Sequence, residues 1–114
     1  MTLSDHIFKI LAEAGISETY ESWYKQDIDK THLVFQQMSE TPADYSDGHY
    51  ETLLHDYRFD VFSKDLNDAE QMKKEARAAL EAAGFIWQGT QYEYDSKIRY
   101  YHSSSKYLLE EVAN

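Results

Sequence analysis

The sequence contains no cysteine, a single proline and only four glycines in 114 residues. The lack of cysteine excludes disulfides and thiolate metal sites, and nothing in the composition argues for secretion. No window approaches the roughly twenty apolar residues of a membrane span, and no basic segment leads into an apolar run at the start. We therefore expect a soluble, cytoplasmic product whose residues 1–114 form a single domain.

Positive charge is also scarce: 11 Lys and Arg residues stand against 21 Asp and Glu residues, which gives a formal net charge of -10. The excess is concentrated between residues 40 and 70, where nine carboxylates face two basic side chains: Glu40, Asp44, Asp47, Glu51, Asp56, Asp60, Asp65, Asp68 and Glu70 against Arg58 and Lys64. Such a segment repels phosphate backbones, so binding of DNA as a ligand is not expected. Three roles remain compatible with this acidic segment: it could mimic DNA, allow DNA to pass without binding it, or only increase solubility.

Periodicity is clearest in two helices and one strand. Residues 2–15 and 66–84 carry apolar side chains at steps of three and four, and each run ends at a glycine, Gly15 or Gly84. The second helix presents a stripe of mostly small side chains, namely Ala69, Met72, Ala76, Ala79, Leu80 and Ala83. Residues 57–62 alternate ring or branched side chains with charges, which predicts a strand with one covered face.

The other strands are less sharply bounded. Residues 18–24 and 31–39 read as strands separated by a loop at 25–30, and the second should lie inside the sheet because both of its faces are apolar. Residues 40–49 contain the only proline and the turn signal Asp47-Gly48, which predicts a long polar hairpin tip. A hairpin follows from Ile86, with a turn at 95–97. Residues 102–105 suggest an edge or bulge, and 108–114 a last strand or a docking arm.

This order, α-β-β-β-α-β-β, places the chain in the α+β class. We expect two layers: a mostly antiparallel sheet with two helices packed on it, and an extended hairpin near residues 40–50.

Residue patterns for catalysis are weak. The five histidines lack the spacing of a zinc site, although His49, His55 and Asp56 could share a cation. Ser63 lacks a nucleophile elbow and reads better as a helix entry. Asp44 and Asp47 lack the remaining ligands of a calcium loop. We predict no catalytic, cofactor-binding or metal-binding residues, and hence no enzyme.

Several stretches together resemble a known family. They are the run Leu33-Val34-Phe35-Gln36-Gln37-Met38-Ser39, then Tyr45-Ser46-Asp47, the strand Tyr57-Arg58-Phe59-Asp60-Val61-Phe62-Ser63-Lys64, the helix end Ala82-Ala83-Gly84-Phe85, and an aromatic hairpin with Tyr92-Glu93 and Ile98-Arg99-Tyr100. In pattern, over roughly residues 3–107, the chain resembles the small tail-completion or tail-terminator (head-to-tail joining) proteins of long-tailed bacteriophages and prophages. It departs from them at Thr31-His32, where the commoner form carries a proline near the start of the second strand.

The resemblance implies a structural virion protein of the tail, assembled in the host cytoplasm. It implies a ring, usually of six copies, that caps the tail tube, meets the head connector and lets DNA pass, without catalysis, cofactor, metal or membrane. Under this reading, residues 40–50 contact a neighbouring subunit or the connector, with Tyr45 and Tyr50 as anchors and Asp44 and Asp47 steering. The alternative for the tip is disorder until assembly. The alternatives for the protein are an acidic DNA-mimicking inhibitor and a small host adaptor domain.

Overall fold

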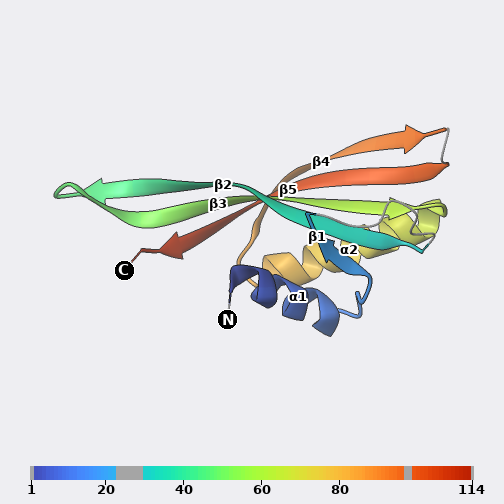
Figure 1. The fold of residues 1–114 in the computed structure, drawn as a ribbon, viewed down its shortest axis with the longest axis horizontal. Helices are drawn as coiled ribbons and strands as arrows, with labels where there is room; N and C mark the ends of the chain where they lie inside the picture. Colours follow the sequence, from blue (N-terminus) through green and yellow to red (C-terminus); the bar gives the residue numbers. More distant parts are fainter. Residues whose placement is uncertain (1, 23–29, 97–98, 114) are drawn as a thin grey trace.

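Two helices and five strands follow one another along the chain (Figure 1), in a computed structural model that describes residues 2–22, 30–96 and 99–113. Their bounds are α1 Leu3–Glu13, β1 Thr19–Glu21, β2 His32–Ser46, β3 His49–Ser63, α2 Leu66–Ala82, β4 Ile86–Asp95 and β5 Tyr100–Val112. The strands form one sheet in the order β1-β2-β3-β5-β4. β1 runs parallel to β2 and the other neighbours are antiparallel. The predicted α+β class and element order are confirmed.

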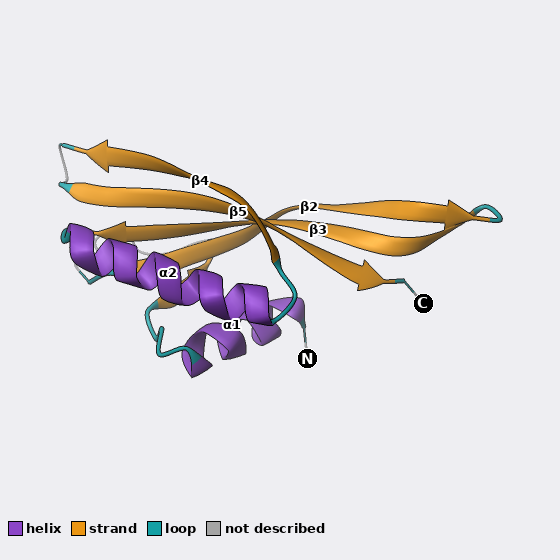
Figure 2. Ribbon diagram, turned by 180° about the vertical axis from the view of Figure 1, so that it is seen from behind, coloured by secondary structure: helices purple, strands orange, loops and turns teal. Residues whose placement is uncertain are grey.

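Both helices lie on the same side of the sheet (Figure 2). α1 is preceded by a capping box between Thr2 and Asp5, and α2 is capped by Asp65, whose carboxylate accepts from the Asp68 N–H. Ser63, just before α2, accepts from the Asp65 N–H at 3.1 Å, as expected of a helix entry rather than a nucleophile.

The two helices also end alike. Gly84 takes a φ of +97°, which lets the Phe85 N–H reach back to the Leu80 carbonyl at 2.9 Å. Ile16 makes the same 2.9 Å contact with Leu11 after Gly15, whose φ is +87°. Both are the left-handed helix endings that a glycine allows most easily.

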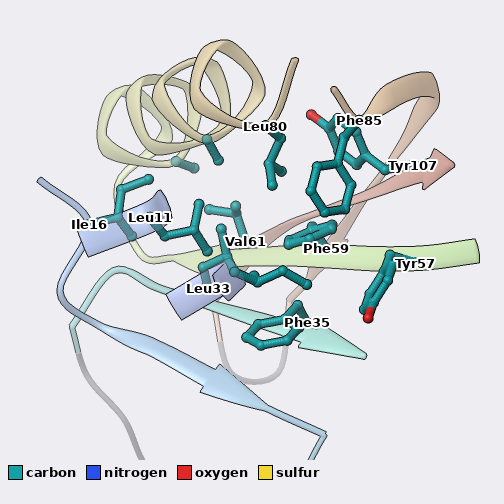
Figure 3. Close-up of a cluster of buried hydrophobic side chains, with 13 residues drawn as sticks. Leu11, Ile16, Leu33, Phe35, Tyr57, Phe59, Val61, Leu80, Phe85 and Tyr107 are labelled. Carbon is teal, nitrogen blue, oxygen red and sulfur yellow. The ribbon is translucent and has the colours of Figure 1, made fainter. Parts of the chain in front are cut away.

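The core lies between the helices and the sheet (Figure 3). From β3 it receives Tyr57, Phe59 and Val61, the alternate residues that sequence periodicity assigns to a covered face. On α2, the small residues Ala69 and Ala76 let the helix approach the sheet closely, and Leu80 fills the space near its end. Aromatic rings then fill the space under the end of α2, where Phe59 packs edge-on against Phe85 and Tyr107.

The hairpin of β2 and β3 is longer than the sequence suggests. Residues 40–46 continue β2 and pair with β3 as far as Ser46 and His49, so only Asp47 and Gly48 form the turn. Pro42 fits because, beyond Phe35, no described strand pairs with the outer edge of β2, and an edge residue can lack an N–H. The prediction of a polar break at 40–49 was wrong in this respect, whereas the extended hairpin is present.

The hairpin projects past the helices and gives the molecule its length, with extents of 53 × 26 × 23 Å (Figure 1). We call residues 39–56, the part of β2 and β3 beyond the bulge at Met38, the arm. The last part of β5 runs beside the arm, pairing as far as Val112 with Thr52. Of the two alternatives for residues 108–114, the strand is therefore correct up to Val112.

Residues 102–105 are not an edge. They lie inside the sheet, because β5 pairs with β3 on one side and β4 on the other throughout this stretch. Small hydroxyl side chains can be buried there when they bond within the sheet, as the Ser105 hydroxyl does with Thr90 at 2.8 Å. At the other end of the sheet, β1 covers residues 19–21 of the predicted strand 18–24. Trp23 and Tyr24, most of the loop at 25–30 and Lys97 in the predicted turn lie outside the described residues.

Candidate interaction surface

The end of the arm brings together the residues predicted to contact a partner. Tyr45 on β2 and Tyr50 on β3 are direct cross-strand partners, so their side chains leave the sheet on the same face. They are 67% and 48% exposed, respectively. Asp47 and Gly48 form the turn beyond them, both with positive φ (51° and 79°), as in the tight turns that suit a twisted hairpin. The tip is thus a regular structure that presents two large rings to solvent.

Asp44 lies next to Tyr45 in β2 and has a φ of +55°. Aspartate tolerates this left-handed conformation better than most residues, since its short carboxylate can bond locally. Asp44 and Asp47 are both exposed, so the structure places a negative charge on either side of Tyr45 along the chain.

The apolar surface continues from the tip along the arm. On the face opposite the helices, Thr52 pairs with Val112 and Leu54 pairs with Glu110, and all four side chains share the face of Tyr50. Val112 is 76% exposed. The sequence prediction missed Leu54 and Val112, although the alternation from Tyr50 through Thr52 to Leu54 marks one face. We call Tyr45, Tyr50, Leu54 and Val112 the arm strip.

Histidine His55 is buried on the other face, at the base of the arm. Its Nδ1 lies 2.9 Å from Gln37 Nε2 and its Nε2 lies 3.3 Å from Glu111 Oε1, so it links β3 to both neighbouring strands. Asp56 faces the opposite side of β3 and accepts from the Ser39 hydroxyl at 2.8 Å. His55 and Asp56 therefore cannot share a cation. The described residues contain no group of three or more His, Asp or Glu side chains that could hold a metal ion.

The nearby Tyr57 hydroxyl reaches Gln37 Oε1 at 3.5 Å. Burial, with smaller contributions from the negative charges of Glu21, Glu40 and Glu111, raises the pKa of Tyr57 to about 12. The base of the arm is thus a buried polar junction between the core and the projecting strands.

The acidic residues of the 40–70 segment do not form one row. Asp60 is buried in ion pairs, Asp65 caps α2, and Asp56 is hydrogen-bonded on the face opposite His55. A DNA mimic needs carboxylates spaced like phosphates along one exposed face. The arrangement therefore does not favour the mimic.

A polar network that sequence reasoning missed joins β3 to β5. Asp60 Oδ1 lies 3.1 Å from His102 Nε2, and Asp60 Oδ2 accepts from Arg58 Nε at 3.0 Å. Burial acts to raise the pKa of Asp60, but hydrogen bonds from His102 and Ser104 and the charge of Arg58 outweigh it and lower that pKa. The His102 ring stacks on Phe62, with centroids 4.3 Å apart. The network therefore links β3 to β5 on the face of the sheet opposite the helices.

Neither α1 nor α2 is long and apolar enough to cross a membrane, and the same holds for any helix in the described parts of the chain.

No protein-family model matches the chain, and neither does any curated protein sequence. Among solved structures, the fold is similar to that of a chain in the virion of a native gene transfer agent particle. The TM-score is 0.63 at 16% sequence identity, and the likeness covers 97% of this chain and 95% of that chain. The two chains share a fold. At this identity the likeness extends to the fold alone, but it includes nearly the whole of both chains.

Proposed function

We propose that this protein is a structural component of a virion. The observation that carries the proposal is the fold likeness to a chain of a gene transfer agent virion, a phage-like particle, over nearly the full length of both chains. A match of such coverage includes the arm and both helices rather than one common motif. Because one fold can host several functions, the proposal also draws on the shape and charge of this chain.

Within the virion, we assign the protein to tail completion: a ring, usually of six copies in the family that the sequence resembles, that caps the tail tube and meets the head connector. The sequence pattern that resembles tail-completion proteins supports this assignment. The surplus of negative charge supports it too, because phosphates find few counter-charges to hold them on an acidic conduit. The role is structural and needs no cofactor or metal.

The arm supplies a suitable contact with a neighbouring copy, the tube or the connector. It is regular, projects from the body, and carries exposed rings and aliphatic groups along one face. Tyrosines at the centre of an interface are typical anchors, and rim carboxylates such as Asp44 and Asp47 set orientation and association rate. A contact between the arm of one copy and the body of the next is head-to-tail, and such contacts can close into a ring.

The test is to delete the gene from the genome that encodes it and to image the particles that this genome produces. Heads and tails that stay separate would support the joining role, and tails of uncontrolled length would support the terminating role. Re-supplying the protein should restore joined particles. Intact particles of normal tail length in the absence of the gene would contradict the proposal.

Electron microscopy of the purified protein adds a second measurement. Rings of the protein on the ends of isolated tail tubes would support tail completion. The proposal would be contradicted if the purified protein bound neither tail tubes nor heads and also failed to restore joined particles when added to heads and tails that lack it.

A further inference from the structure

Strand β4 leaves one long edge of the sheet open. It is last in the strand order, and no described strand pairs with its outer edge. After the bulge between Trp87 and Gly89 its register with β5 is regular from Thr90 to the end of the strand. The outer edge of β2, in contrast, is interrupted by a bulge at Met38, by Pro42 and by the positive φ of Asp44, which are devices that discourage pairing.

A groove runs beside this open edge, on the helix side of the sheet. The groove has a volume of about 240 Å³ and lies between the first turn of helix α2 and strand β4. Most of its lining is aliphatic or aromatic and comes from three elements: Leu66 and Ala69 on α2, Tyr92 and Tyr94 on β4, and Tyr101 on β5. Ser103 and the titratable residues Glu70, Glu93 and His102 complete the lining. Leu66 is 50% exposed, so apolar surface remains uncovered at the mouth of the groove.

The floor of the groove contains a polar group without a partner. Ser103 is buried, and its hydroxyl has no hydrogen-bond partner in the described parts of the chain. Buried hydroxyls are usually bonded, so this unpaired one marks the floor of the groove as incompletely satisfied within the described residues.

The walls of the groove are already held in place. Lys73 Nζ lies 4.7 Å from the centre of the Tyr92 ring, and Tyr94 packs against Tyr101 with centroids 4.8 Å apart. Lys73 also donates to Glu70 at 2.8 Å, which neutralises its charge locally. A ligand would therefore meet a preorganised surface, which lowers the entropic cost of binding.

The charge around the edge is negative. Glu93 points to the face opposite Tyr92 and Tyr94 and its side chain is 81% exposed, although one oxygen lies 3.8 Å from His102 Nδ1. Asp65 and Asp68, at the start of α2, are exposed as well. An extended chain added to β4 would place alternate side chains beside the tyrosines and beside Glu93. Apolar residues suit the first set and basic residues the second.

We propose that β4 and this groove bind an extended segment of another protein by strand addition. The segment alternates apolar with Lys or Arg residues; its backbone pairs with the β4 edge, and an apolar side chain enters the groove between Leu66 and Tyr94. Peptides that extend a sheet in this way gain affinity from main-chain hydrogen bonds and specificity from pockets for alternate side chains. The proposal depends on β4 and α2, so it stands whether or not the arm joins a virion.

The experiment uses the full chain labelled with ¹⁵N and an eight-residue peptide in which lysine alternates with valine. Titration followed by NMR should shift the backbone amides of residues 90–95, together with those of Leu66 and Ser103. The variant Leu66→Lys, which replaces apolar lining with a charge at the mouth of the groove where an apolar side chain enters, should weaken binding by about tenfold. Ile86→Lys is the matched control, since Ile86 is 49% exposed at the start of β4 and lies outside the groove. It should change affinity less than about twofold.

Two peptides methylated on the backbone nitrogens of alternate residues test the pairing itself without altering the protein. Only one set of N–H groups can face β4, so one methylated peptide should lose binding and the other should retain it. Replacing the lysines with glutamate should abolish binding. The proposal is overturned if the parent peptide does not bind, if both methylated peptides bind like the parent, if the glutamate peptide binds equally well, or if the shifts lie on the arm instead.

Discussion

Asp60 on β3 and His102 on β5 are joined across the sheet, with 3.1 Å between Asp60 Oδ1 and His102 Nε2. Arg58 bonds the other oxygen of the carboxylate, which is buried although it lies on the face opposite the helices. Only the carboxylate is buried, since the Arg58 side chain is 42% exposed, and its removal would take the shared acceptor from both partners. The network thus ties the central strand β3 to its neighbour β5.

The first prediction concerns this network. Asp60→Ala should lower the free energy of unfolding by about 2 kcal/mol, because it leaves Arg58 and His102 without their shared acceptor. Urea unfolding of the purified protein measures the change. Asp56→Ala is the control: Asp56 lies on the same face of β3 but is bonded only to the exposed Ser39 hydroxyl among the contacts described, and should cost less than about 1 kcal/mol. Equal losses in the two variants would contradict a special role for Asp60.

Low pH should reduce the free energy of unfolding through the same carboxylate, that of Asp60. The pKa of Asp60 is lower in the folded state than the value of about 3.9 expected in the unfolded chain. The unfolded state therefore takes up the proton first, so this stabilisation is present above pH 4 or so and is lost as the pH falls through the folded pKa. Between about pH 5 and pH 2, the free energy of unfolding of Asp60→Asn should fall less steeply than that of the wild type. Parallel pH profiles would refute this assignment.

High pH should lower the stability of the protein through two buried tyrosine hydroxyls. Burial is the main cause that raises the pKa of both Tyr57 and Tyr107 to about 12. Because an unfolded tyrosine loses its proton near pH 10, the stabilisation is complete below that pH and is lost as the pH rises toward about 12. A double variant, Tyr57→Phe with Tyr107→Phe, should show a flatter decline in unfolding free energy over this interval. Urea unfolding at several pH values checks the slope, and an unchanged slope would count against the assignment.

The end of α2 offers a prediction about backbone conformation. Gly84→Ala should destabilise the protein by about 1 to 2 kcal/mol, because φ is +97° and an L side chain is strained there. A Cβ at this position would meet no atom within 4 Å, so the cost is conformational rather than steric. Gly84→Asn should lose less, since asparagine adopts left-handed φ more readily. Thermal unfolding distinguishes the two, and an alanine variant as stable as the wild type would contradict the reasoning.

Much of this fold could be predicted from local signals. The helices repeat their apolar residues every three to four positions and end at Gly15 and Gly84, and both the stripes and the endings are present. The covered face of β3 follows from the alternation of Tyr57, Phe59 and Val61. These features depend on neighbours within one or two turns of chain, so a sequence read in short windows contains them.

The arm could not be delimited in the same way. Proline, aspartate and glycine are typical of loops. In this edge strand, however, the N–H that Pro42 lacks would have no partner strand to donate to, and Asp44 accommodates a positive φ. Only the register with β3 shows that these residues belong to a strand. Tyr45 and Tyr50 were predicted as a pair of anchors, and the structure places them opposite each other; their role in binding stays a prediction.

Long-range contacts were also beyond the sequence. Asp60 and His102 are 42 residues apart and meet only because β3 and β5 pair in one register. The serines at 103–105 resemble an edge by composition, yet they lie between two strands. Ser103 and Ser105 are buried on the helix side of the sheet, and Ser104 faces the other side, where it bonds Asp60. The groove beside β4 likewise depends on how α2 crosses the sheet, which no local pattern specifies.

The last prediction concerns the tip of the arm. Tyr45→Ala combined with Tyr50→Ala should change the free energy of unfolding by less than about 1 kcal/mol, because both rings are largely exposed and lose only their cross-strand contact. If the tip anchors a partner, the same variant should restore few joined particles to a strain that lacks the gene, since exposed rings that become buried at an interface dominate its binding energy. Ile86→Ala removes a side chain of similar exposure far from the tip and should restore joining fully. Counting joined heads and tails by electron microscopy decides the matter: normal joining by the double variant, at normal expression and unchanged stability, would exclude the tip tyrosines as anchors and move the contact elsewhere on the arm strip.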